Sequence, residues 1–458
     1  MRLFISLLVG ILTLLAAPAV LPAQESGKIS LVRDAETENT IRYFAAPLFK
    51  AAGLDPEALR VHLVLDDGMN AFVAGGQRIF INTGLLRTTE SADGVIGVLA
   101  HETGHIAGGH LAKMHENLRT ASAQTIIAVV LGAAAAIASG DPDAAVAGVT
   151  LGQSVAERSF LRYTSANESQ ADLAALRYLE QTGQSARGLL EILDKLQDQE
   201  LLSGSRQDPY LRTHPLSQER ISTVREHMEE SRYSNSPVDP NLALLHRRIR
   251  GKLNGYVDPP ARTLARYSAE DTDIEARYAR IQAFIKLNRT EDALAVVDRL
   301  IELAPNDMFF HEQKGEILYR AGRVADSVPS YRQAVVLVER NGGELPLIRL
   351  SLAQSLLEID GRDAAAEALD HLKRITHYEP WMPRAWRLLA TAYGRLDDIG
   401  GASYALAEEA LLLRDREGVK RNVARALELL PPASPLRERV LDIQNLMNGK
   451  AKEAPAGG

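Results

Sequence analysis

The stretch His101-Glu102-Thr103-Gly104-His105 decides how the first half of the chain is interpreted. The residues before it are apolar, which favours a buried helix. Because residues four apart share one face of a helix, the imidazoles of His101 and His105 can be directed at a single metal ion. Glu102 lies one position further round, where it can reach a water molecule on that ion without being a ligand. The spacing predicts a zinc site, and the plain alternative is a half-buried helix that carries two histidines.

A zinc ion held by two histidines needs a third protein ligand, and the sequence offers Glu168. We expect a helix to open near Asn167 and to end at Gly183. Glu168 and Asp172 are four positions apart on this helix and therefore share a face. An acid one turn beyond a ligand can hydrogen-bond a ligand histidine and fix its tautomer. The alternative is that both residues are surface acids at a polar helix start.

His110 competes with Glu168 for the place of third ligand. It follows His101 by nine positions, so on a continuous helix it would point to the opposite side. Gly108-Gly109 can break the helix and bring the imidazole round. The pattern H-E-x-x-H-x-x-G-x-x-H, however, requires histidine at the position of Leu111. We therefore favour Glu168 and assign His110 a structural role.

A histidine far along the chain can also reach such a site. In Thr213-His214-Pro215 the proline favours an extended backbone at His214. Its imidazole would either stabilise the oxyanion of a tetrahedral intermediate or cover the metal in a resting state. The alternative is a loop histidine without a role. Arg220, on the next expected helix, is a candidate for anchoring this loop or binding substrate.

These three motifs, in this order, resemble those of the gluzincin family of HtpX-, Oma- and Ste-type zinc proteases. The resemblance covers about residues 35–230. It implies one zinc ion per chain bound by three ligands, His101, His105 and Glu168. It further implies that Glu102 is the general base and that Asp172 is the acid behind a ligand histidine. His214 matches a histidine that some members use as a removable cover on the metal.

Two apolar runs, residues 61–65 and 78–82, are expected to form strands of a small sheet beside the site. An edge strand of such a sheet can pair with an extended substrate, or it can serve only for packing. Residues 125–138 and 144–156 are apolar but shorter than a bilayer span. They are expected to form either a buried helical hairpin or a flap that touches a membrane or an unfolded client.

Composition narrows the class of protein. The chain has 458 residues, 46% hydrophobic and 24% charged, which predicts a globular protein of more than one domain. A net charge of −7 without a long basic block argues against nucleic acid as a partner. The absence of cysteine excludes disulfides, cysteine catalysis and thiolate metal ligands. Residues 1–23 have the charged start, short apolar core and small residues of a Sec-type signal peptide, which predicts a periplasmic protein.

The second half of the chain has a repeat of about 34 residues, the tetratricopeptide period. Its small and bulky positions include Ala293, Val297, Gly315, Tyr331, Ala334, Trp386, Leu389 and Tyr393. The expected architecture is mostly α, with a zincin-like α+β metalloprotease domain followed by an α-solenoid whose concave groove binds peptides or proteins. The expected divisions are signal peptide 1–23, protease 24–233, linker with a helical segment 234–272, repeats 273–447 and disordered tail 448–458.

The function expected from this reading is that of a zinc metalloendopeptidase. No clear transmembrane helix is present, so the closer resemblance is to the soluble periplasmic branch of the family. That branch implies quality control of outer-membrane proteins by degradation of misfolded or stalled substrates. It also implies a repeat groove facing the outer-membrane β-barrel assembly machinery, with peripheral membrane contact. One alternative is a chaperone or adaptor whose repeats carry the function above a latent, histidine-covered zinc site. A hydrolase of non-peptide substrates is a third reading, which the strands and the groove disfavour.

Overall fold

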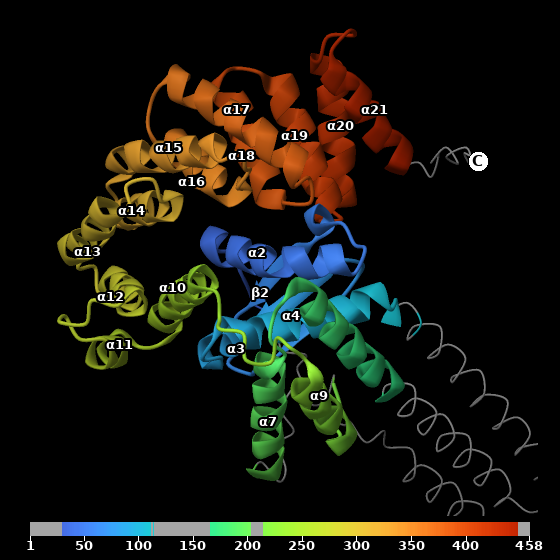
Figure 1. Cartoon of the computed structure of the whole chain (residues 1–458). Helices are drawn as coiled ribbons and strands as arrows, with labels where there is room; N and C mark the ends of the chain where they lie inside the picture. The colour runs from blue at the N-terminus through green and yellow to red at the C-terminus, as the bar shows by residue number, and fades with distance from the viewer. Residues whose placement is uncertain (1–29, 111–112, 114–164, 203–213, 448–458) are drawn as a thin grey trace, which may run out of the picture.

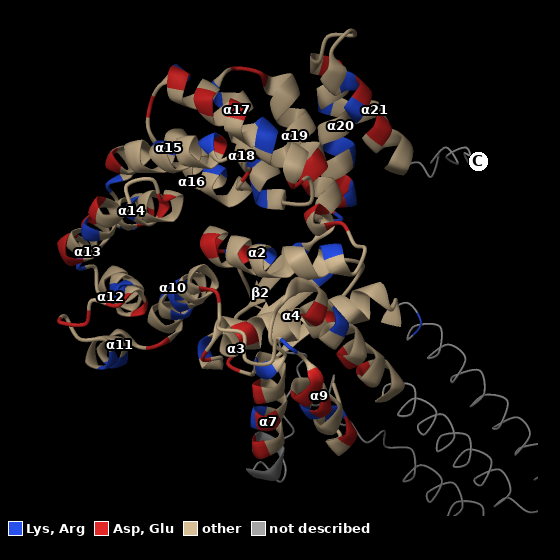
Figure 2. Ribbon diagram, viewed as in Figure 1, with Lys and Arg blue, Asp and Glu red and all other residues tan. Residues whose placement is uncertain are grey.

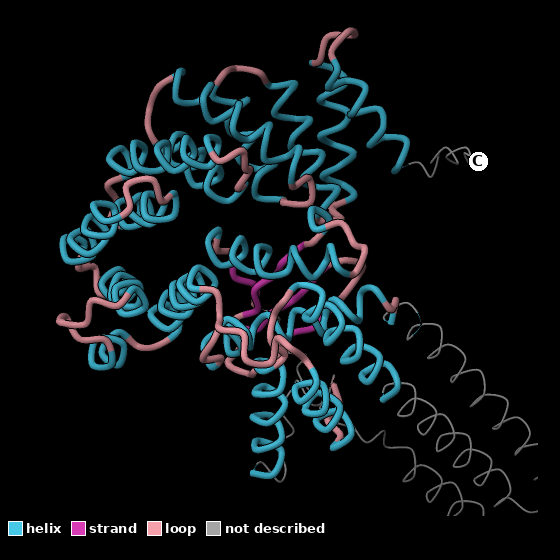
Figure 3. Tube along the Cα trace, in the orientation of Figure 1, coloured by secondary structure: helices cyan, strands magenta, loops and turns pink. Residues whose placement is uncertain are grey.

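The computed structural model describes residues 30–110, 113, 165–202 and 214–447. The expected signal peptide, both apolar segments, the loop that ends at Thr213 and the C-terminal tail lie outside these residues. Within the described part, helices predominate around one small sheet, as the tube in Figure 3 shows. No helix among the described residues combines the length and the apolar character needed to cross a bilayer.

The sheet has four strands in the order β1-β2-β4-β3. The strands are β1 (Leu31–Val32), β2 (Arg60–Val64), β3 (Ala71–Val73) and β4 (Arg78–Asn82). β2 and β4 are parallel, with Val61 opposite Ile79, and β3 and β1 are antiparallel to their neighbours. The strands expected over 61–65 and 78–82 are therefore confirmed to within one residue. β3 forms one edge of the sheet and packs against α4.

The helix that carries the first motif is α4 (Ala92–Ala107), and Ser91 caps its N-terminus by accepting a hydrogen bond from the Gly94 amide. It packs against α2 (Ala35–Ala51) and α7 (Arg187–Leu202). Residues 165–182 form a further helix, which ends at Gly183 as expected. The remaining elements of this half are η1 (Pro56–Ala58), α3 (Thr83–Thr88) and α9 (Gln218–Glu230). The apolar faces of the helices α2, α3, α4, α7 and α9 and the sheet share one core, which places the motif helix in the interior.

The second half is a series of helices, each of which packs against the next along the chain. They are α12 (Ile274–Lys286), α13 (Thr290–Leu303), α14 (Met308–Arg320), α15 (Val324–Arg340), α16 (Pro346–Glu358), α17 (Arg362–Tyr378), α18 (Pro383–Arg395), α19 (Ile399–Leu412), α20 (Arg416–Leu429) and α21 (Pro435–Met447). Ala293, Val297, Tyr331, Ala334 and Trp386, chosen from the repeat pattern, are all buried. The fold is therefore a mostly helical α+β domain with a small sheet, followed by a helical repeat region, which confirms the expected fold class.

The stretch expected as a linker contains α10 (Pro240–Val257) and α11 (Pro260–Arg266). On one side α10 buries Ile249 and Leu253 in the core of the first half, and on the other it packs against α12. This connection is therefore packed on both sides. Farther along, the repeats curve back over α2 (Figure 1). There Glu379, which follows α17, pairs at 3.1 Å with Arg33, which lies just before α2.

Candidate metal centre and active site

The motif helix brings two imidazoles and one carboxylate into the interior. His101 and Glu102 are fully buried and His105 is 8% exposed. Nε2 of His105 lies 3.0 Å from Nε2 of His101, which confirms that the two rings face the same space. Both rings are held by the same face of one helix, one turn apart.

The helix of residues 165–182 supplies the carboxylates. Glu168 Oε2 lies 3.2 Å from His101 Nε2, and Glu168 Oε1 lies 3.3 Å from His105 Nε2. Asp172, one turn later, places Oδ1 2.8 Å from the opposite ring nitrogen of His101, Nδ1. The two acids thus contact the two sides of one imidazole, one in the shared space and one behind the ring.

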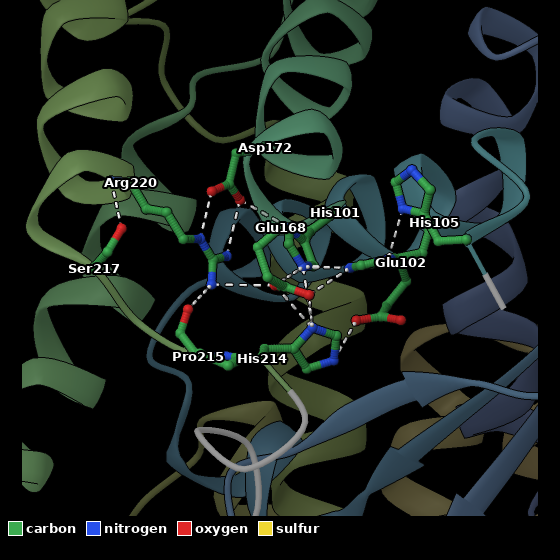
Figure 4. A network of polar contacts seen from close by, with 10 residues as sticks. His101, Glu102, His105, Glu168, Asp172, His214, Pro215, Ser217 and Arg220 are labelled. Atoms are coloured by element: carbon green, nitrogen blue, oxygen red, sulfur yellow. Dashed lines mark hydrogen bonds and ion pairs between the residues drawn. The ribbon is translucent and has the colours of Figure 1, made fainter. Parts of the chain in front are cut away.

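His214 enters the same space from a different segment, just ahead of α9 (Figure 4). Its Nδ1 lies 3.1 Å from Glu168 Oε2 and 3.3 Å from His101 Nε2, and the residue is 5% exposed. Ligand atoms of His101, His105, Glu168 and His214 all lie within 4.8 Å of one another. The structure therefore brings these four side chains to one place, with Glu102 and Asp172 in contact with them.

The spacing of these atoms suits a small tetrahedral cation. Zinc binds nitrogen and oxygen at about 2.0–2.1 Å, so the edges of its ligand tetrahedron are about 3.3–3.4 Å long. Five of the separations among the four side chains are 3.0, 3.1, 3.2, 3.3 and 3.3 Å. Imidazole nitrogens and carboxylate oxygens are also among the donors that zinc binds in proteins. The residues therefore fit the metal that the motif predicts.

Glu102 has a different environment from that of the ligand candidates. Both of its carboxylate oxygens are buried without a hydrogen-bond partner among the described residues. His214 Nε2 lies 3.5 Å from Glu102 Oε1. A buried acceptor without a hydrogen bond lowers the stability of the fold, so its presence calls for an explanation. Binding of a water molecule that takes part in a reaction would be such an explanation.

Charges in the metal-free cluster are unevenly distributed. Burial lowers the pKa of His101, but its hydrogen bonds with Asp172 and Glu168 raise that pKa to about 10. Burial lowers the pKa of His105 to about 3. Burial also raises the pKa of Glu168, yet the charge of His214 and hydrogen bonds from the histidines hold it well below its usual range. Burial raises the pKa of Glu102, which suits a group that must accept a proton.

Arg220 contacts both acids of the site and the segment that carries His214. Its Nε and Nη2 donate to the two oxygens of Asp172 at 2.6 and 3.0 Å, and its Nη1 lies 3.1 Å from Glu168 Oε2. Nη1 also donates to the carbonyl of Pro215 at 3.0 Å, next to His214 (Figure 4). Of the two roles suggested for Arg220, the geometry favours anchoring the loop. Sequence spacing could not indicate this, because the carboxylates lie on another helix.

His110 lies outside the set of four metal-facing side chains. The helix ends at Ala107, and Gly109 has a left-handed φ of 62°, so the chain turns as the two glycines allowed. This turn places His110 Nδ1 3.0 Å from Nδ1 of His105, on the side of that ring away from the cluster. The register argument against a ligand role agrees with this placement.

Known proteins with similar sequences point to the same chemistry. A model described as Peptidase family M48 matches residues 34–228, and one described as Bacterial transcriptional activator domain matches residues 249–345. The beta-barrel assembly-enhancing protease of Yersinia pestis is 25% identical over 72% of this chain and 67% of its own length. A putative protein of the same name from Vibrio cholerae is 26% identical over 82% of this chain and 75% of its own length. A mitochondrial metalloendopeptidase of Schizosaccharomyces pombe is 25% identical over 42% of this chain and 53% of its own length.

Fold, site and relatives together define the class of this protein, which is that of the zinc metalloproteases. More particularly, residues 34–228 form a domain that matches the model of peptidase family M48. The similarity to the beta-barrel assembly-enhancing proteases extends beyond this domain into the helical repeats, since it covers 72% to 82% of the chain.

Proposed function

We propose that the chain is a periplasmic zinc endopeptidase that removes misfolded or stalled outer-membrane proteins, with zinc bound by His101, His105 and Glu168. The observation that carries the proposal is the set of 3.0–3.3 Å separations among the ligand atoms beside a buried carboxylate that no described residue hydrogen-bonds. The relatives named for β-barrel assembly support the choice of substrate class. The helical repeats support recognition of protein partners, for which we propose the outer-membrane β-barrel assembly machinery.

The proposed chemistry divides the work among these side chains. When bound, zinc would polarise the scissile carbonyl and make water acidic enough to lose a proton near neutral pH. Glu102 accepts that proton and delivers it to the leaving amine, a transfer that its raised pKa favours. Asp172 holds Nδ1 of His101, which leaves Nε2 of that ring directed at the cluster.

The Glu102→Gln variant tests this proposal. Glutamine has nearly the same shape but accepts no proton, so cleavage of a casein-like substrate should fall by about 10²–10⁴-fold. Zinc content should stay that of the unmodified protein, because Glu102 is not in the proposed ligand set. Glu168→Gln is the matched variant and should lose zinc as well as cleavage. Cleavage by Glu102→Gln at the original rate would show that the base is assigned wrongly.

A second candidate function is that of a chaperone or adaptor with a latent zinc site. The position of His214, in contact with Glu168 and close to Glu102, favours low basal activity. Complementation of a null strain separates the two functions. An adaptor carrying Glu102→Gln would still restore outer-membrane assembly, whereas a protein that acts by proteolysis would not.

A further inference from the structure

The two histidines of the motif are held from behind in the same way, but by different residues. His101 directs Nε2 into the cluster and Nδ1 to Asp172 at 2.8 Å. His105 also directs Nε2 into the cluster, and its Nδ1 lies 3.0 Å from Nδ1 of His110. Among the described residues, these are the hydrogen-bond partners that the structure gives to the two outer ring nitrogens.

We propose that His110 is a positioning residue for metal binding, accepting a hydrogen bond from Nδ1 of His105 and so fixing the tautomer in which Nε2 of His105 is free to bind the ion. A neutral imidazole carries one N–H, and which nitrogen carries it is set by the partner of the other nitrogen. With the proton on Nδ1, the lone pair of Nε2 faces the cluster. This inference rests on the proposed zinc site and gives His110 a part in metal binding beyond the structural role expected from its spacing.

The backbone turn after α4 brings His110 into contact with His105. On a continuous helix His110 would point away from the cluster. The left-handed φ of 62° at Gly109 turns the chain back, and His110 becomes 5% exposed beside His105. The two ring planes are nearly perpendicular, at 83°, and their centroids are 5.0 Å apart. With the two Nδ1 atoms 3.0 Å apart, both nitrogens lie between the rings, as a nitrogen-to-nitrogen hydrogen bond requires.

Gly108 completes the arrangement. A Cβ atom on this residue would lie 2.3 Å from Nε2 of His110 and 2.8 Å from two further ring atoms. The φ of Gly108 is −71°, so alanine is compatible with the backbone there. The Gly108→Ala variant therefore displaces the His110 ring without changing any polar group of the site.

The test measures zinc affinity by competition with a chelator, in three variants of the full chain. His110→Leu removes the acceptor and should weaken zinc binding by about 10–100-fold, the usual effect of losing a partner behind a ligand. His110→Asn keeps an acceptor oxygen close to the position of Nδ1 and should recover most of that loss. Gly108→Ala should weaken binding in the same direction as His110→Leu.

The matched control is His246→Asn, which replaces another buried histidine, 1% exposed on α10 and outside the metal-facing set. It should leave zinc affinity unchanged even where it lowers stability. Thermal unfolding with and without zinc gives a second measurement. A merely structural His110 would lower Tm equally in both forms, whereas a positioning residue reduces the increase in Tm that zinc produces.

The inference is overturned if His110→Leu binds zinc as tightly as the unmodified protein, or if His110→Asn is as weak as His110→Leu. Failure of the zinc site itself has a different signature. In that case the unmodified protein and Glu168→Gln would bind zinc equally weakly, whatever residue stands at position 110.

Discussion

His214 Nε2 lies 3.5 Å from Glu102 Oε1, although the two residues come from separate segments of the chain. The same ring contacts Glu168 through Nδ1 at 3.1 Å. One imidazole thus lies between the proposed base and a proposed metal ligand. Of the two roles expected for His214, covering the metal or stabilising an oxyanion, this placement favours the first.

The first prediction concerns His214→Ala. Removing a side chain that contacts both carboxylates should open the site, so basal cleavage of a casein-like substrate should rise by about tenfold, equivalent to about 1.4 kcal/mol. Initial rates at saturating zinc measure this change. If the imidazole instead stabilises the oxyanion, the same variant will cleave more slowly than the unmodified protein.

The second prediction concerns Arg220. Arg220→Met removes one of the two cationic groups that contact both buried carboxylates, Asp172 and Glu168, the other being His101. The free energy of unfolding should therefore fall by about 3–5 kcal/mol. Urea unfolding of the metal-free protein measures it. The control on the same helix is Arg225→Met, whose partner Asp194 is half-exposed. That surface pair should contribute at most about 1 kcal/mol. Equal losses for the two variants would contradict the prediction.

The third prediction concerns the junction between the two halves. Arg248 on α10 is 4% exposed and pairs with Glu36 of α2 and with Asp307 ahead of α14, each at 2.6 Å. Figure 2 shows the acidic start of α2 beside the basic residues of α10. Arg248→Met should therefore lower the free energy of unfolding by about 3–5 kcal/mol, because Glu36 stays buried.

Arg332→Met is the matched control for the junction, because its partner Glu367 lies on the surface of the repeats. It should cost at most about 1 kcal/mol. After loss of Arg248, Glu36 keeps only the more distant cation of Lys252, at 3.7 Å. A second check is the double variant Arg248→Met with Glu36→Gln, which removes the buried charge of Glu36 and should recover part of the loss. No recovery would mean that Arg248 acts through its packing and not through its charge.

The fourth prediction concerns pH. Burial, with help from the charge of Arg250, lowers the pKa of His246 to about 4. The unfolded chain has the ordinary value of about 6.5, so between these values the unfolded state binds more protons and the folded state loses stability as the pH falls. The group should contribute about 3 kcal/mol above pH ~6.5 that is lost by pH ~4.

Urea unfolding between pH 7.5 and pH 4.5 measures this contribution. His246→Asn cannot titrate, so its stability should fall less over the same range. The two curves should converge toward low pH. Parallel curves would show that His246 carries its proton equally in both states.

Much of the fold followed from short-range patterns. Periodicities among neighbouring residues predicted three features. These are the apolar helix around His101 and His105, the strands near Val61 and Ile79, and the helical repeats. β1 and β3 have two and three residues, too few for an alternation to be visible. The sequence therefore predicted the architecture but only half of the sheet.

For the candidate site, too, the sequence predicted the local arrangement but not the contacts between distant segments. Spacing alone put His101 and His105 on one helical face and Glu168 and Asp172 on another, because i and i+4 positions are fixed by helix geometry. The pairing of these faces was not encoded locally. Asp172 contacts His101 across 71 positions and Arg220 across 48, and Arg248 contacts Glu36 across 212.

By itself the sequence determined which chemical groups this protein can use and which of them share a helix. The tertiary structure decided which of these groups come into contact. The left-handed backbone at Gly109 brings His110 to His105, and His214 contacts Glu168. Arg248 connects α2 to the start of the repeats. The physical reason is the separation along the chain over which each kind of interaction acts. Helix and strand periodicity act over a few residues, whereas these contacts form only when packing of the common core fixes segments that are distant along the chain.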